Sequence, residues 1–270
     1  MEQVRLNHPI EIFRWSENTT QLFGVASAFY KERFGAPGHQ AIDYRAEKVA
    51  PKNGYGTKIL SAHTKNARCI STFVDTTLRT KGNGIQLLEE LDDGRKLETL
   101  YWHLADIHIR VGEMIEPQQP IGTPSILQKA IGTMGNTGQV FPQPTQNLPW
   151  NGVHCHFAVR IYKSDGIPFI TDYPGNFVDP VPFLFREGNK LPIKFTRNLF
   201  IGMSGDDIAW LQTCLALEGF AKDYQPNSFF GKRTMRDVRL LQQKYAISPS
   251  IGYVGIITRQ FLMKKYSLYA

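Results

Sequence analysis

This sequence has few cysteines. It shows no long apolar run and no recognisable leader segment. The three cysteines, Cys69, Cys155 and Cys214, lie far apart, and no Cys-x-x-Cys pair occurs. An odd number of separated cysteines argues against a disulfide framework, so we expect these thiols to pack in a core. No apolar run is long enough to span a bilayer, and the first residues hold neither an apolar segment nor a small-residue cleavage site. We therefore expect no membrane insertion and no signal peptide.

Negative charge is also in deficit, with 31 Lys and Arg against 24 Asp and Glu, a formal charge of +7 and a pI of about 9.2. This balance suits an anionic partner such as nucleic acid, a membrane surface or a bacterial cell wall. The basic residues are scattered and form no basic helix, so nucleic acid is not expected as a partner. A chain of 270 residues with 42% apolar content is long enough for two domains with real cores.

Short strand-like runs separated by turns dominate the first two thirds of the chain. They cover residues 57–62, 67–74, 84–91, 97–104 and 153–160. A turn signal, Asp92-Asp93-Gly94, joins the third run to the fourth and predicts a hairpin. The glycine-rich segment 132–138 is predicted as a loop. We therefore predict a β-rich, antiparallel-sheet domain over residues 1–184.

The pattern changes after this region. Residues 185–197 are charged and lack clear periodicity, which is typical of a linker. Apolar residues then recur with helical spacing, as at Ile208, Leu211 and Leu215. Two further helices are predicted, around 238–245 and over about 257–265. The predicted fold class is α+β with more than one domain, in which a small three-helix domain at 198–270 follows the β-rich one.

Two histidines lie two residues apart in the apolar, β-prone segment 152–160. Successive strand side chains point to opposite faces, so His154 and His156 project to the same side. Two imidazoles on a rigid strand suit a metal ion, or a metal ion with a proton-transfer partner. The alternative is a strand with two surface histidines. His39 and Asp43 also share a face if the chain there is extended, because their separation is even.

Three motifs follow one another along the chain: His39-x-x-x-Asp43, Tyr101-Trp102-His103-Leu104 and His154-Cys155-His156. In this order they resemble the LytM/lysostaphin-type zinc metallopeptidases, which cut the peptide part of bacterial peptidoglycan. The segments 21–24, 111–138 and 178–182 resemble further parts of that family. The resemblance therefore covers about 20–183 and implies that the β-rich domain is catalytic.

Carried over residue by residue, the resemblance implies one zinc ion per chain, bound by His39, Asp43 and His156. His103 and His154 would then be catalytic histidines that do not bind the metal. Three protein ligands leave one tetrahedral position for water, whose pKa zinc lowers to about 7. One catalytic histidine would take the water's proton, and the other would stabilise the oxyanion or protonate the leaving amine. The sequence leaves the division of these two roles open.

The sequence departs from the family pattern at Ala41, where a glycine is usual, and in the extra segments 124–130 and 140–151. Both segments are expected to wall the substrate groove and alter substrate choice. Tyr101 is predicted either as a substrate-binding wall or as a core aromatic residue. Trp102 is predicted to lie in the core, because it alternates away from its neighbours. The remaining histidines are expected to be surface or structural residues: His8, His63 and His108.

The C-terminal residues resemble the small helical peptidoglycan-binding module in the segments 202–208, 211–212, 229–234 and 252–255. This resemblance implies a cell-wall-binding role. The alternative is a small helical domain that packs on the first domain and binds nothing. Phe230 and Tyr253 are candidate aromatic contacts to a sugar or peptide, although burial is the commoner use of phenylalanine.

The sequence thus favours a zinc-dependent endopeptidase of peptidoglycan, expected to be monomeric. Two alternatives stay open: a non-hydrolytic wall-binding or regulatory protein on the same scaffold, and a zinc amidase acting at the sugar–peptide junction. Without a signal peptide, the chain is expected to be a phage endolysin, held in the host cytoplasm until it is released. A secreted protein whose signal has been removed is the other interpretation of that start.

Overall fold

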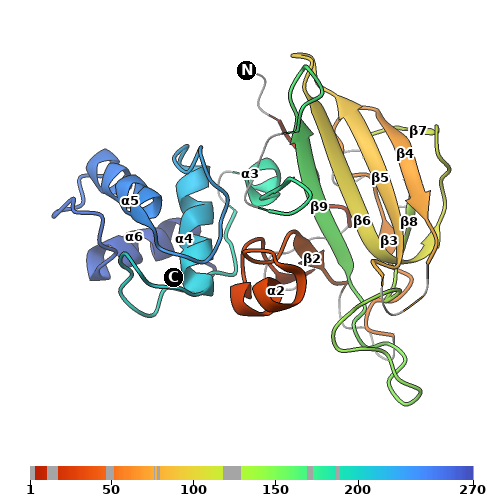
Figure 1. Ribbon diagram of the computed structural model, residues 1–270, viewed down its shortest axis with the longest axis horizontal. Coiled ribbons are helices and arrows are strands. Elements are labelled where there is room, and N and C mark those ends of the chain that lie inside the picture. Colours follow the sequence, from red (N-terminus) through yellow and green to blue (C-terminus); the bar gives the residue numbers. More distant parts are fainter. Residues whose placement is uncertain are drawn as a thin grey trace. The chain divides into compact units, whose positions relative to one another are not determined.

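The computed structural model describes residues 4–10, 18–46, 52–75, 77, 80–117, 129–168, 173–186 and 189–269 (Figure 1). The chain forms two compact units, Met1–Thr20 with Ile42–Phe169 and Gln21–Ala41 with Ile170–Ala270. The predicted domain limits of 1–184, 185–197 and 198–270 stay predictions. None of the helices in the described ranges is long and apolar enough to cross a bilayer.

The first unit is built on a large sheet, whose longer strands run side by side in Figure 1. Its strand order is β1 (Thr19–Gln21), β2 (Ile42–Tyr44), β9 (Cys155–Tyr162), β6 (Lys96–Ile107), β5 (Asn83–Glu90), β4 (Ala67–Phe73) and β7 (Met114–Ile115). From β2 to β7 the neighbouring strands pair antiparallel. The prediction of a β-rich antiparallel sheet is therefore confirmed.

The predicted hairpin joins β5 to β6. Gly94 adopts a φ of +81°, which an L-residue with a side chain rarely takes, and its N–H donates to Leu91 O at 2.9 Å. The predicted loop 132–138 is wrong at its start, because Gly132–Met134 forms β8, which pairs with β3 (Lys58–Ile59) and with β6. A Cβ on Gly132 would lie 2.6 Å from Asp106 O, so this glycine permits close strand pairing and does not mark a turn.

One face of the central strands is covered by fully buried aromatic residues. The ring of Phe157 on β9 lies 5.3 Å from that of Tyr101 on β6 and 6.0 Å from that of Tyr44 on β2. Cys155 is buried on the same strand, and burial raises the pKa of its thiol. All three cysteines are buried thiols, as predicted. This packed face fixes β9, and the opposite face is left for His154 and His156.

The second unit contains the helices α2 (Ser27–Phe34), α3 (Val181–Leu184), α4 (Asp206–Leu217), α5 (Lys232–Lys244) and α6 (Ile256–Tyr266), and the short strand β10 (Phe177–Val178). The last three helices overlap the predicted positions, and α5 begins earlier than predicted, at Lys232. That residues 198–270 form a separate three-helix domain stays a prediction. The segment 21–41 packs within this unit, because Ser228 Oγ donates to Gly24 O at 2.6 Å and Ala26 N donates to Asp206 Oδ1 at 2.8 Å.

Two buried glutamines tie successive helices of this unit together in the same way. Gln212 on α4 donates from Nε2 to Thr234 Oγ1 on α5, at 3.0 Å, and Gln242 on α5 donates from Nε2 to Thr258 Oγ1 on α6, also at 3.0 Å. The Oε1 atom of each glutamine accepts a backbone N–H. Each helix start is thereby joined to the preceding helix by satisfied polar groups.

Asp179 is a buried carboxyl in the second unit. Its Oδ1 accepts from Val181 N and its Oδ2 from the Thr213 hydroxyl, both at 3.0 Å. Burial nevertheless raises its pKa from 3.8 to about 7, since the two hydrogen bonds lower it by less than desolvation raises it. The folded protein therefore holds a proton, between about pH 4 and pH 7, that the unfolded chain has released.

This difference predicts that the free energy of unfolding falls as the pH rises through that window, by on the order of 4 kcal/mol. Asp179→Asn stays neutral and keeps an acceptor for Val181 N. We expect its stability advantage over the wild type to grow from pH 5 to pH 8, measured by urea unfolding. Asp223→Asn is the control, since Asp223 is exposed and paired with Arg236. Parallel pH profiles for the wild type and Asp179→Asn would contradict this assignment.

Candidate functional site

The register of β2 against β9 places Asp43 directly opposite His156. Asp43 Oδ1 lies 3.0 Å from His156 Nδ1, and both residues are buried, with less than a tenth of each exposed. A carboxylate oxygen and an imidazole nitrogen this close together are a pair of donors that one metal ion can share. Two strands that are far apart in sequence thus deliver the first pair of donors.

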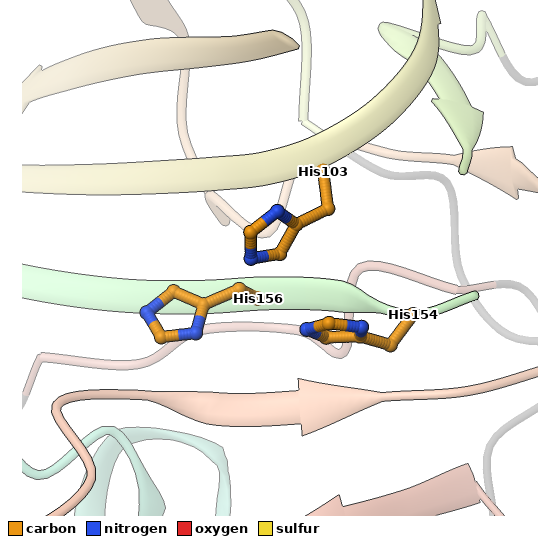
Figure 2. A group of neighbouring side chains, drawn as sticks. All are labelled: His103, His154 and His156. Atoms are coloured by element: carbon orange, nitrogen blue, oxygen red, sulfur yellow. The ribbon is translucent and has the colours of Figure 1, made fainter. Parts of the chain in front are cut away.

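His154 precedes β9 and pairs with Gly135 through an isolated bridge. Its Nε2 lies 3.8 Å from Asp43 Oδ1, so His154 and His156 both face the same carboxylate. Figure 2 shows the two rings on one side of the strand. The same-face placement predicted from their spacing is confirmed.

His103 reaches the same place from β6. Its ring centre lies 4.6 Å from that of His154 and 5.8 Å from that of His156, and Figure 2 shows the ring pointing from β6 toward β9. The backbone of His103 has a φ of +65°, and the pairing of β6 with β8 shifts register between Leu104 and Asp106. A left-handed backbone in a residue with a Cβ is costly, and such strain clusters at functional sites.

This backbone conformation turns His103 to the side of the sheet that Trp102 occupies. Trp102 pairs in register with His156, and the two rings stack at 4.9 Å with an interplanar angle of 13°. The prediction that Trp102 and His103 point to opposite sides is wrong, because the left-handed residue interrupts the strand alternation at His103. The prediction that Trp102 is buried is confirmed, and its burial is against a site histidine.

Backbone carbonyls fix the tautomers of two of these rings. His103 Nδ1 lies 2.8 Å from Thr137 O, and His154 Nδ1 lies 2.7 Å from Gly152 O. A carbonyl oxygen only accepts, so in each ring Nδ1 carries the hydrogen and donates. Nε2 is then the nitrogen that can take a proton in each neutral ring.

The protonation of His103 follows from its surroundings. Burial lowers its pKa well below the ordinary value, and the neighbouring imidazoles of His154 and His156 lower it further. The hydrogen bond to Thr137 and the charge of Asp43 act in the opposite direction but do not prevail. His103 is therefore neutral at neutral pH.

His39 belongs to the second unit and is fully buried there. Its Nδ1 lies 3.2 Å from Leu22 O, and its ring centre lies 5.1 Å from that of Tyr30. The carbonyl again assigns the hydrogen to Nδ1, so Nε2 is the ring nitrogen suited to a metal. In the sequence His39 stands four residues before Asp43.

The donors gathered in the first unit fit a transition metal. His103, His154 and His156 each offer one ring nitrogen, and these atoms lie within 4.8 Å of one another. The carboxylate of Asp43 adds an oxygen donor beside two of them. Imidazole and carboxylate together are the ligand set of catalytic zinc sites, while Mg²⁺ and Ca²⁺ prefer oxygen alone.

Tyr101 does not line this site. It is fully buried, and its hydroxyl accepts from Ala62 N at 2.8 Å and hydrogen bonds with Thr99 Oγ1 at 3.1 Å. The structure thus places it in the core, which is the second of the two roles considered from the sequence. Cys155 points to that same side.

The three remaining histidines stand outside the cluster. His63 is fully buried between Glu89 Oε2 at 2.7 Å and Thr99 Oγ1 at 2.8 Å, which is a structural role. His8 hydrogen bonds through Nδ1 to Tyr44 OH at 2.8 Å, and His108 is exposed. These positions agree with the surface or structural roles expected from the sequence.

One of the two extra segments can be described. Within 140–151, the Trp150 ring lies 4.8 Å from that of Tyr55, and Asn136 Nδ2 donates to Pro149 O and Asn151 O. The segment 140–151 is therefore attached to the loop that follows β8, in which Gly135 pairs with His154. Most of the other segment, 124–130, lies outside the described residues.

Thr137 is a functional residue that the sequence did not single out. Its carbonyl orients His103, its hydroxyl donates to Leu104 O at 2.8 Å, and the same hydroxyl accepts from Asn83 N at 2.9 Å. The start of β5 and the part of β6 that carries His103 are thereby joined at one residue. Only its position in a Gly-Asn-Thr-Gly segment could have drawn attention to it.

Comparison with solved structures finds several peptidases among the similar chains. The catalytic domain of the antimicrobial peptidase lysostaphin from Staphylococcus simulans is 18% identical, with 62% of this chain and 92% of that chain covered and a TM-score of 0.38. LytU is 24% identical, with 64% and 88% covered and a TM-score of 0.38. A zinc-containing peptidase from Vibrio cholerae is 18% identical, with 63% and 41% covered and a TM-score of 0.38, so this chain spans less than half of that protein.

This likeness is to the LytM/lysostaphin-type peptidase fold that the sequence motifs indicate. With TM-scores of 0.38 it carries no argument about this chain, and the chemistry is argued from the side chains described above. No protein-family model and no curated protein matches the chain.

Proposed function

We propose that this protein is a zinc-dependent endopeptidase that hydrolyses peptide bonds in bacterial peptidoglycan. One observation carries the proposal: His103 and His154 are each held by Nδ1 on a backbone carbonyl, with their rings beside the buried pair of Asp43 and His156. Two proton-carrying imidazoles next to a His–Asp donor pair are suited to hydrolysis at a metal.

His39, Asp43 and His156 are the proposed zinc ligands. When bound there, zinc would acidify a water molecule and polarise the carbonyl of the scissile peptide. Asp43 Oδ1 and His156 Nδ1 lie 3.0 Å apart, so these two donors stand side by side on neighbouring strands. His39 is proposed as the third ligand because it stands four residues before Asp43, in the His-x-x-x-Asp motif.

His103 and His154 are the proposed proton-transfer residues. His103 is neutral because its pKa is lowered, so its Nε2 is available to take a proton from the attacking water. His154 lies 4.6 Å away, ring to ring, and can receive a proton at Nε2 and donate it to the leaving amine. The hydrogen bonds from Nδ1 to Thr137 and Gly152 keep both rings in place as their charge changes.

Binding to the wall is the second part of the proposal. The C-terminal residues 198–270 would hold the enzyme on its insoluble substrate, and the net charge of +7 would favour an anionic wall. A role as a phage endolysin stays a prediction from the sequence.

The test is digestion of purified peptidoglycans of different cross-link types, with the products identified by mass spectrometry. We expect new amino termini within the peptide part, complete loss of this activity after chelation, and recovery on adding zinc. Release of whole stem peptides from the glycan would indicate an amidase. Binding to the wall with no cleavage in the presence of zinc would indicate a non-hydrolytic protein. Cleavage that survives full metal removal would contradict the mechanism.

A further inference from the structure

A lysine lies next to the site, on the ring of Trp102. Lys81 Nζ lies 4.2 Å from the centre of the Trp102 ring, a cation–π contact, and the side chain is exposed. Among the described residues, no acidic side chain forms an ion pair with Lys81. An exposed ammonium held in one place by an aromatic ring is available to an anionic ligand.

The same tryptophan connects this lysine to the proposed metal ligands. The Trp102 ring stacks on His156 at 4.9 Å and contacts the Lys81 ammonium at 4.2 Å. An extended peptide advances by about 3.3 Å per residue. The ammonium therefore lies within two or three residues of a peptide bond that is cut beside His156.

Arg160, on β9 four residues beyond His156, is a second cation that acts on Lys81. Partial burial lowers the pKa of Lys81, and the charge of Arg160 lowers it further. Glu98, opposite Arg160 in the register of β6 and β9, accepts from Arg160 at 3.1 Å and from the Tyr162 hydroxyl at 2.5 Å. A carboxylate from a ligand would relieve the repulsion between the two cations.

The backbone that carries Lys81 is fixed to the loop that orients His103. A Cβ on Gly82, which has a φ of +70°, would lie 2.3 Å from Thr137 O, so the two segments are in direct contact. Gln139 N also donates to Thr80 O at 2.7 Å. The ammonium is thus placed relative to the histidines by tight backbone packing, and its position does not depend on a long free loop.

We propose that Lys81, held on Trp102, is a carboxylate-binding subsite that selects peptide substrates with a free carboxylate two or three residues from the scissile bond. This specificity rests on the proposed peptidase function. The ligand is a peptide carboxylate, because the site offers one compact cation and an apolar ring to a chain already bound beside His156.

The test compares native peptidoglycan with the same material after its carboxylates have been converted to carboxamides by carbodiimide and ammonium chloride. The wild type is expected to cleave the amidated wall about tenfold more slowly, as the loss of one charge-assisted contact requires. Lys81→Met is expected to cleave both walls at the same low rate, with a raised KM and little change in kcat. Lys81→Arg keeps the charge and is expected to keep the preference.

Lys65→Met is the matched control, since Lys65 is an exposed lysine paired with Asp92 and its loss lowers the net charge by the same amount. It should retain the full preference for the native wall. The subsite is overturned if Lys81→Met still discriminates between the walls, or if Lys65→Met loses the preference equally, which would assign it to overall charge. If the wild type cuts neither wall, the proposed function fails first, and this outcome is distinct from active cleavage without discrimination.

Discussion

Asp43→Asn is expected to lower the zinc content of the purified protein from about one ion per chain to near zero and to abolish cleavage of peptidoglycan. Asp43 faces His156 at 3.0 Å and His154 at 3.8 Å, so its charge is the main negative charge in the cluster. Asparagine keeps the size and removes that charge, and a neutral oxygen is a far weaker zinc ligand. Metal analysis after dialysis, beside a peptidoglycan digest, measures both effects.

His39→Ala and His156→Ala are expected to lose or weaken zinc in the same way. The control is His108→Asn, because His108 is exposed and stands outside the cluster. The three imidazoles of His103, His154 and His156 lie close enough together to form a rival ligand set. If Asp43→Asn keeps a full zinc ion while changes at His103 and His154 empty the site, the rival set is the metal site.

Local sequence patterns predicted the antiparallel sheet and the shared face of His154 and His156. Two short β-prone runs, 84–91 and 97–104, with a glycine turn between them, predict the hairpin of β5 and β6. Strand alternation places His154 and His156 on one face, because side-chain direction in a regular strand depends on parity. Burial of all three cysteines also followed from their number and spacing.

Other features depend on contacts that no local pattern reveals. The left-handed backbone of His103 breaks the parity rule at one residue, which turns His103 to the same side as Trp102. The strand at Gly132 looked like a loop because glycine there serves a close approach to Asp106. The carbonyl of Thr137 orients His103 only after segments 34 residues apart in the sequence have come together.

The second large effect is expected at the two histidines that are not proposed to bind zinc. His103→Asn and His154→Asn should each lower kcat by about 10²- to 10⁴-fold, the range typical of a lost general acid or base. Both variants should keep about one zinc ion per chain. Activity on peptidoglycan, metal content and thermal unfolding are measured together on each protein.

Asparagine is chosen because its amide N–H₂ occupies the place of Nδ1, so the bonds to Thr137 O and Gly152 O can be kept while Nε2 is removed. Asparagine also tolerates the left-handed backbone at position 103, where the φ is +65°. Unfolding temperatures close to the wild type are therefore expected, and lost activity then reports the missing proton carrier. Near-full activity in either variant would exclude that histidine from the chemistry, and loss of zinc together with activity would move it to the metal.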